Sequence, residues 1–152
     1  MKKLFFAFTL LMTVTSVTVA QTNDKAIGLR GGNGTELSYQ HPLSGNTRVE
    51  LDLGLPGWKY AGIVLSGVHQ WLWNIDGGLD WYAGLGGQVG SIRWATGNPY
   101  DFGLGLAGQI GLEYNFPIPL QLSLDWRPVW NIIPSGHGFG YESAAFGIRY
   151  RF

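Results

Sequence analysis

Large apolar residues recur at every second position along most of this chain, and this period of two constrains the fold more than any other feature. The clearest run extends from Phe102 to Phe116, where mostly apolar even positions alternate with glycine, alanine, Gln109, Glu113 and Asn115. Successive side chains of a β-strand point to opposite faces, so this run predicts a long strand with one apolar and one small or polar face.

Seven further segments have the composition of strands. Residues 47–54, 79–90, 120–127 and 143–152 alternate as clearly as the first run, and residues 26–30, 35–40 and 60–73 complete the set. The faces of residues 60–73 cannot be assigned from the pattern. Gly31-Gly32-Asn33-Gly34 is a tight-turn sequence between the first two strands. We therefore expect eight antiparallel strands.

The first twenty residues have the layout of a secretory signal peptide. Lys2 and Lys3 precede an uncharged apolar or hydroxylic stretch, and Thr18-Val19-Ala20 is a cleavage site with small residues where a signal peptidase reads them. The stretch is short for a transmembrane helix. We expect two parts: a cleaved signal peptide at 1–20 and a single domain at 21–152.

The length of the exported part suits eight membrane-spanning strands. Removing twenty residues from 152 leaves 132, or roughly 16 per strand with its connection, where a spanning strand needs about 9–11. We expect inner turns at 41–46, 74–78 and 115–119, and outer loops at 31–34, 55–59, 91–101 and 128–140. Short inner turns and longer outer loops are typical of outer-membrane barrels.

The positions of the charged residues indicate which face of the predicted barrel is polar. A soluble barrel has a polar outside and an apolar lumen, but here the charges share the face of the small residues, and long apolar runs occupy the other face. We therefore predict an all-β, eight-stranded, antiparallel, up-and-down transmembrane β-barrel with a lumen filled by paired charges. The predicted lumen network consists of Arg30, Glu36, Arg48, Glu50, Asp52, Asp80, Glu113, Asp125, Arg127, Arg149 and Arg151.

The overall composition excludes several classes of protein. The chain has no cysteine, a formal net charge of zero and only 13% charged residues. It therefore lacks the basic surface of a nucleic-acid binder and the ligands of a cysteine zinc site. The three histidines, His41, His69 and His137, show no metal-binding spacing. We expect no cofactor, no metal and no nucleic-acid partner.

Aromatic residues near the strand ends predict two interfacial belts, because amphipathic rings favour the headgroup level of a membrane. The inner belt would contain Trp71, Trp73, Trp81, Tyr114, Phe116, Tyr150 and Phe152. The outer belt would contain Trp58, Tyr60, Trp94, Tyr100, Phe102, Trp126, Trp130 and Tyr141.

The last strand ends on phenylalanine, with an apolar residue at every second position before it. This pattern resembles the C-terminal signal that the barrel-assembly machinery reads. The matching residues are Ala144, Phe146, Ile148, Tyr150 and Phe152. Together with Gly78-Leu-Asp-Trp-Tyr-Ala-Gly-Leu-Gly, Gly111-Leu-Glu-Tyr-Asn-Phe and Leu122-Ser-Leu-Asp-Trp-Arg-Pro, it makes the whole exported chain similar to small outer-membrane barrels of the OmpA/OmpX-like type.

The resemblance implies a location and partners but hardly an activity. We expect a protein of the bacterial outer membrane that contacts outer-membrane lipid and lipopolysaccharide. We expect it to need the assembly machinery for insertion and to have a structural or surface-interaction role through its outer loops, without enzymatic activity. The external ligand is not specified by the sequence.

Two other functions stay open. Some small outer-membrane barrels are lipid A deacylases or acyltransferases, and Ser135, His137 and Glu142 could form a nucleophile, base and orienting group at the outer rim. A small pore is the third choice, because a continuous water channel normally takes many more strands than eight.

Overall fold

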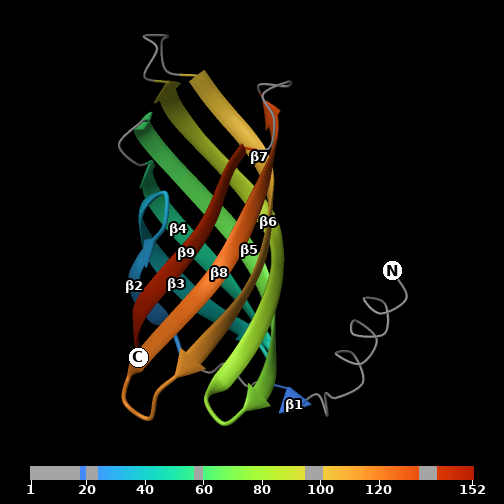
Figure 1. Ribbon diagram of the computed structural model, residues 1–152. Coiled ribbons are helices and arrows are strands. Elements are labelled where there is room, and N and C mark those ends of the chain that lie inside the picture. Colours follow the sequence, from blue (N-terminus) through green and yellow to red (C-terminus); the bar gives the residue numbers. More distant parts are fainter. Residues whose placement is uncertain (1–17, 20–23, 57–59, 95–100, 134–139) are drawn as a thin grey trace, which may run out of the picture.

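The computed structural model describes residues 18–19, 24–56, 60–94, 101–133 and 140–152, and it forms an antiparallel sheet closed into a barrel (Figure 1). Each strand pairs with the next, and the last returns to the first barrel strand. The barrel strands are β2 (Ala26–Gly31), β3 (Gly34–Ser44), β4 (Thr47–Pro56), β5 (Tyr60–Asp76), β6 (Leu79–Trp94), β7 (Asp101–Asn115), β8 (Leu120–Ile133) and β9 (Gly140–Arg151). This confirms the predicted all-β class and antiparallel order of eight barrel strands.

A short additional strand lies outside the barrel. β1 (Thr18–Val19) falls within the predicted signal peptide and pairs with Trp73 and Asn74 near the end of β5. The remaining residues of that predicted segment, apart from these two, lie outside the described part of the chain. Within the described residues, no helix is long and apolar enough to cross a membrane.

The two ends of the barrel differ. The turn end, drawn at the bottom of Figure 1, carries the C-terminus and the connections Gly45–Asn46, Gly77–Gly78 and 116–119. The loop end carries the tight hairpin at Gly32–Asn33 and three connections that fall at 57–59, 95–100 and 134–139, outside the described residues. Gly45 and Gly77 have φ values of 56° and 52°, a conformation that side chains disfavour and that these turns require.

The strands are longer than predicted, and the loops correspondingly shorter. β3 continues through 41–44, β5 through 74–76 and β7 through Asn115, where turns were expected. At the loop end β2 includes Gly31, β3 begins at Gly34, and β4 includes residues 55–56. There too β6 includes 91–94, β7 begins at Asp101, β8 includes 128–133 and β9 begins at Gly140. Those parts of the predicted turns and loops were wrong.

Two prolines account for much of this error. Pro42 and Pro128 fall in the predicted connections 41–46 and 128–140, and proline lacks the N–H that a ladder needs. In the structure β3 continues through Pro42 and β8 continues through Pro128. The pairing register shifts beside each proline, between Pro42 and Ser44 and between Arg127 and Val129. A β-bulge leaves one residue of the strand unpaired, so the strand can continue although proline donates no ladder hydrogen bond.

The registers define the dimensions of the barrel. Following paired residues once around the sheet from Gly103 on β7 returns to the same strand at Glu113, a shear of ten residues (113 − 103). The path runs through Gly103, Gly90, Val64, Gly54, Glu36, Arg30, Gly147, Ser123 and Glu113. With eight strands this shear gives a tilt of about 40° and a radius of about 8 Å. The lumen is therefore just wide enough to be filled by side chains.

Candidate functional site: the charged lumen

The barrel is apolar outside and polar inside. The outward face carries exposed large apolar side chains along every strand, among them Leu29, Leu53, Leu85 and Leu106, which are 49–66% exposed. The inward face holds most of the buried polar groups. Ten of the eleven charged residues predicted for the lumen are buried there: Arg30, Glu36, Arg48, Glu50, Asp52, Asp80, Glu113, Asp125, Arg127 and Arg149.

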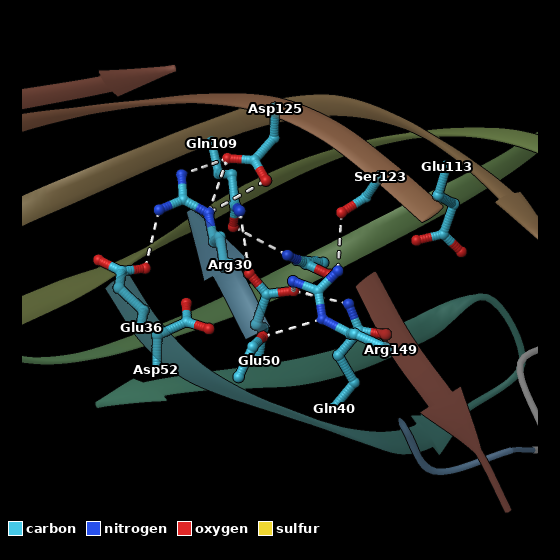
Figure 2. A network of polar contacts seen from close by, with 12 residues as sticks. Arg30, Glu36, Gln40, Glu50, Asp52, Gln109, Glu113, Ser123, Asp125 and Arg149 are labelled. Carbon is cyan, nitrogen blue, oxygen red and sulfur yellow. Dashed lines mark hydrogen bonds and ion pairs between the residues drawn. The ribbon is translucent and has the colours of Figure 1, made fainter. Parts of the chain in front are cut away.

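Five of these charges form a chain of alternating sign across the lumen, here called the five-residue cluster. Arg127 on β8 contacts Asp52 Oδ2 on the opposite strand β4 through Nη1 at 2.5 Å, and Glu36 Oε1 on β3 through Nη2 at 2.5 Å. Arg30 Nη1 donates to Glu36 Oε2 at 2.8 Å. Arg30 also donates from Nε and Nη2 to Asp125, as Figure 2 shows. Two guanidinium groups therefore serve three carboxylates.

Four other charges form a balanced group, the four-residue cluster. Arg149 Nη2 lies 3.0 Å from Glu50 Oε2. Arg48 makes a two-pronged contact with Glu113, with Nη1–Oε1 at 3.0 Å and Nη2–Oε2 at 2.5 Å. All four side chains are nearly sealed from solvent, and their two positive and two negative charges cancel.

Amide side chains join the two ion pairs of the four-residue cluster. Arg48 Nε donates to Gln70 Oε1 at 2.5 Å, Gln70 Nε2 donates to Gln109 Oε1 at 2.8 Å, and Gln109 Nε2 donates to Glu50 Oε1 at 3.0 Å. Gln40 Nε2 adds a bond of 2.6 Å to Glu50 Oε2. A relay in which each amide both accepts and donates fixes the orientation of every member.

Two hydroxyl groups complete the coordination of Arg149. Its Nε donates to Ser38 Oγ at 2.9 Å. Its Nη1 donates to Ser123 Oγ at 2.7 Å (Figure 2). On the other side of the lumen, the Tyr82 hydroxyl donates to Asp125 Oδ2 at 3.2 Å. These hydrogen bonds satisfy the buried charges, which would otherwise be costly in a low-dielectric interior.

Arg151 and Asp80 depart from the expected network. Arg151 lies at the turn end, where its partly exposed side chain is 3.4 Å from the exposed Asp24. Asp80 is buried, but its partners in the described part of the chain are amides: Asn74 Nδ2 at 2.6 Å and Asn115 Nδ2 at 3.0 Å. Arg151 therefore caps the rim, and Asp80 is held by hydrogen bonds rather than by an ion pair.

The strand whose faces the sequence left unassigned is now resolved. The even positions of β5 from Val64 to Leu72 are buried in the lumen, whereas Ile63 and Leu65 are 57% and 48% exposed on the outside. Val64, Val68 and Leu72 make the inward face of β5 as apolar as its outward face, which explains the ambiguous pattern. For the same reason the role of Gln70 was missed. On β3, by contrast, the alternation continued from Glu36 indicates that Ser38 and Gln40 point into the lumen, where the structure has them.

The candidate catalytic residues Ser135, His137 and Glu142 have side chains outside the described part of the chain. Ser135 and His137 lie outside the described residues, and only the backbone of Glu142, in β9, is described. Within the described parts of the chain, no three acidic, histidine or cysteine side chains are arranged to hold a metal ion.

The residues of the C-terminal pattern share the outward face of β9. Ala144 is exposed, and Phe146, Ile148, Tyr150 and Phe152 are 48–59% exposed. Phe152 and Lys25 exchange backbone hydrogen bonds of 2.9 and 3.1 Å, which extend the closure between β9 and β2.

The aromatic residues agree only in part with two belts. Trp73 and Trp81 stack at the turn end with centroids 4.2 Å apart, and Phe102 and Trp130 are well exposed towards the loop end. Trp126, expected at the outer belt, lies instead near the middle of β8, because that strand continues to Ile133. Trp58 and Tyr100 lie outside the described residues, and the side chains of Tyr60, Trp94 and Tyr141 do too.

Solved structures with the same architecture identify the fold. The N-terminal barrel domain of OprF from Pseudomonas aeruginosa matches with a TM-score of 0.75 and 16% identity, covering 88% of this chain and 100% of that one. This chain has the fold of OmpA/OmpX-like eight-stranded barrels. Neisserial surface protein A matches with a TM-score of 0.61 and 15% identity, covering 85% and 94% of the two chains.

A third match was determined in a lipid environment. The outer-membrane protein Ail of Yersinia pestis, in a phospholipid bilayer nanodisc, matches with a TM-score of 0.52 and 13% identity, covering 85% of this chain and 97% of that one. No protein-family model and no curated protein matches the sequence. At these identities the matches show a common barrel fold, and function has to be argued from the residues of this OmpA/OmpX-like barrel itself.

Proposed function

We propose that this chain is an integral protein of the bacterial outer membrane, with a lumen plugged by charge pairs and a structural or surface-interaction role through its loop end. The observation that carries the proposal is the inverted polarity of the barrel. Buried arginines and carboxylates fill the lumen, while exposed leucine, isoleucine and aromatic side chains cover the outside. Water would expel such an outer surface, whereas acyl chains solvate it.

The fold and the sequence also support an orientation of the barrel in the membrane and a route of insertion. With the start of the exported chain and the short turns on the periplasmic side, the loop end would face the outside, as in other barrels of this type. Lipid and lipopolysaccharide would contact the apolar face, and the barrel-assembly machinery would read the C-terminal residues. The solved structures of similar fold include outer-membrane proteins, which supports the same location.

The contacts across the lumen favour a plugged barrel over a pore. Arg127 and Asp52 join opposite strands, and Arg48 and Arg149 reach across to Glu113 and Glu50. An ion following the barrel axis would have to separate these pairs, at a cost of several kcal/mol for each charge left buried alone.

Cell fractionation and bilayer recordings test the proposal. The protein expressed from its full sequence should appear in the outer-membrane fraction, should need detergent for extraction, and should give no steady conductance in a planar bilayer. Recovery as a detergent-free soluble monomer would refute the membrane assignment. A steady ohmic current would refute the plug.

The enzyme alternative has a separate test. Lipid A from cells that express the chain should have the same mass spectrum as lipid A from cells that express Ser135→Ala or His137→Ala. A modification present only with the unaltered chain would replace the structural role with lipid A modification.

A further inference from the structure

Three buried oxygen atoms on neighbouring strands have no hydrogen-bond partner, and they lie in one row. Asp52 Oδ1, Ser66 Oγ and Gln88 Oε1 are each sealed from solvent without a bond in the described part of the chain. Asp52 on β4 is paired in register with Ser66 on β5, and Ser66 is paired with Gln88 on β6. Side chains of directly paired residues on one face of a sheet start about 5 Å apart. Three of the four buried side-chain oxygens without a bond in the described part of the chain are therefore grouped, and the fourth, Gln121 Oε1, lies apart on β8.

The charge balance points to the same place. The five-residue cluster holds three carboxylates and two guanidinium groups, so that with every group ionised it carries one negative charge. Asp125 accepts hydrogen bonds from Arg30 and from the Tyr82 hydroxyl, and Glu36 accepts hydrogen bonds from Arg30 and Arg127. Asp52, in contrast, has one ion-pair contact, from Arg127 to Oδ2. Asp52 is therefore the carboxylate of the cluster with the fewest cationic contacts, and its unbonded Oδ1 belongs to the row.

Ser38 on β3 is paired in register with Asp52 and offers a hydroxyl on one side of the row, whereas the wall on the other side is apolar. Val64 and Val68 flank Ser66 on the inward face of β5, and both are buried. Val68 also packs with Ala107 on β7 and Val129 on β8. These side chains can donate no hydrogen bond, so the row of oxygens lies against an apolar wall.

We propose that Asp52, Ser66 and Gln88 form a binding site for one small monovalent cation, of the sodium class, held without its hydration shell. A carboxylate, a hydroxyl and an amide carbonyl are hard oxygen ligands that suit an alkali cation. One positive charge neutralises the cluster, and the ion satisfies the three oxygens together. The site goes beyond the proposed role of the barrel, because it makes the filled lumen dependent on a specific ion.

Thermal unfolding of the full barrel in detergent tests the site. The apparent Tm is measured in sodium chloride and in choline chloride at equal ionic strength, because choline is too large to enter the row. Ligand binding to the folded state alone raises its stability. We therefore expect the Tm of the unaltered chain to be higher in sodium by about 3 °C or more. Equal Tm values in the two salts, as expected if a proton or a water molecule satisfies the oxygens, would overturn the proposal.

Variants locate the effect. Asp52→Asn removes the charge at constant shape and should abolish the difference between the salts, and Ser66→Ala should raise the sodium concentration at half-effect about tenfold or more. Asp80→Asn is the control: it neutralises a different buried carboxylate, one that is held by amides and lies outside the row, and it should keep the full difference. Retention of the sodium effect in Asp52→Asn, or its loss in Asp80→Asn alone, would refute the site.

Discussion

Replacing Arg149 by leucine is the most direct test of the lumen network. The guanidinium is completely buried and donates to Glu50, Ser38 and Ser123 at 2.7–3.0 Å. Leucine would leave Glu50 in the lumen with bonds from Gln40 and Gln109 and no cation in contact. Removing one partner of a buried ion pair typically costs about 3–5 kcal/mol, because the other charge stays buried without compensation.

The assay is equilibrium unfolding by urea of the barrel refolded in detergent micelles or vesicles, followed by tryptophan fluorescence and by the mobility of the folded band on a gel. We expect Arg149→Leu to lower the free energy of unfolding by about 3–5 kcal/mol. Arg151→Leu is the matched control. It lies on the same strand but is partly exposed, and its ion pair with Asp24 at the rim should contribute less than about 1 kcal/mol.

A second variant separates the stranded charge from the lost packing. In Arg149→Leu with Glu50→Leu, neither charge remains, and apolar pairs often replace buried ion pairs at little cost. We expect this double variant to recover much of the stability lost by the single one. The reasoning would be refuted if Arg149→Leu lowered the free energy of unfolding no more than Arg151→Leu does. It would also be refuted if the double variant lost more stability than Arg149→Leu and Glu50→Leu lose together as single variants.

Three further changes test closure, hydrogen bonding and assembly. Gly28→Ala should prevent or strongly slow refolding, since its Cβ would lie 2.0 Å from a backbone oxygen of β9, whereas Gly31→Ala on the same strand meets nothing within 4 Å and should refold normally. Tyr82→Phe should lower the free energy of unfolding by about 1 kcal/mol in the urea assay, since it removes one hydroxyl donor to Asp125; no measurable loss would mean that this bond contributes nothing. Phe152→Ala should reduce the amount of barrel in the outer membrane of cells but leave the refolded protein nearly as stable, because the ring is 59% exposed and the backbone bonds stay. Normal surface levels would argue against its role in assembly.

The period of two was sufficient to predict the class, the number of barrel strands and the polarity of the two faces. These follow from local geometry, because alternation along a strand does not depend on which strand lies next to it. Glu113 and Gln109, for example, share the inward face of β7 whatever their partners are. Where both faces are apolar, as on β5 with Val64, Val68 and Leu72, the pattern does not show which face points into the lumen. The inward position of Gln70 could therefore not be predicted.

Partners and strand ends were decided only by the tertiary structure. The shear of ten residues sets which strands face each other at each height, and it brings Arg127 to Asp52 and Arg48 to Glu113, 75 and 65 residues apart in the chain. Bulges at Pro42 and Pro128 carry the strands beyond the points where proline predicts a loop. Both features arise from closure of the sheet. A local pattern shows that a charge points inward, but only the closed ring determines what it meets there.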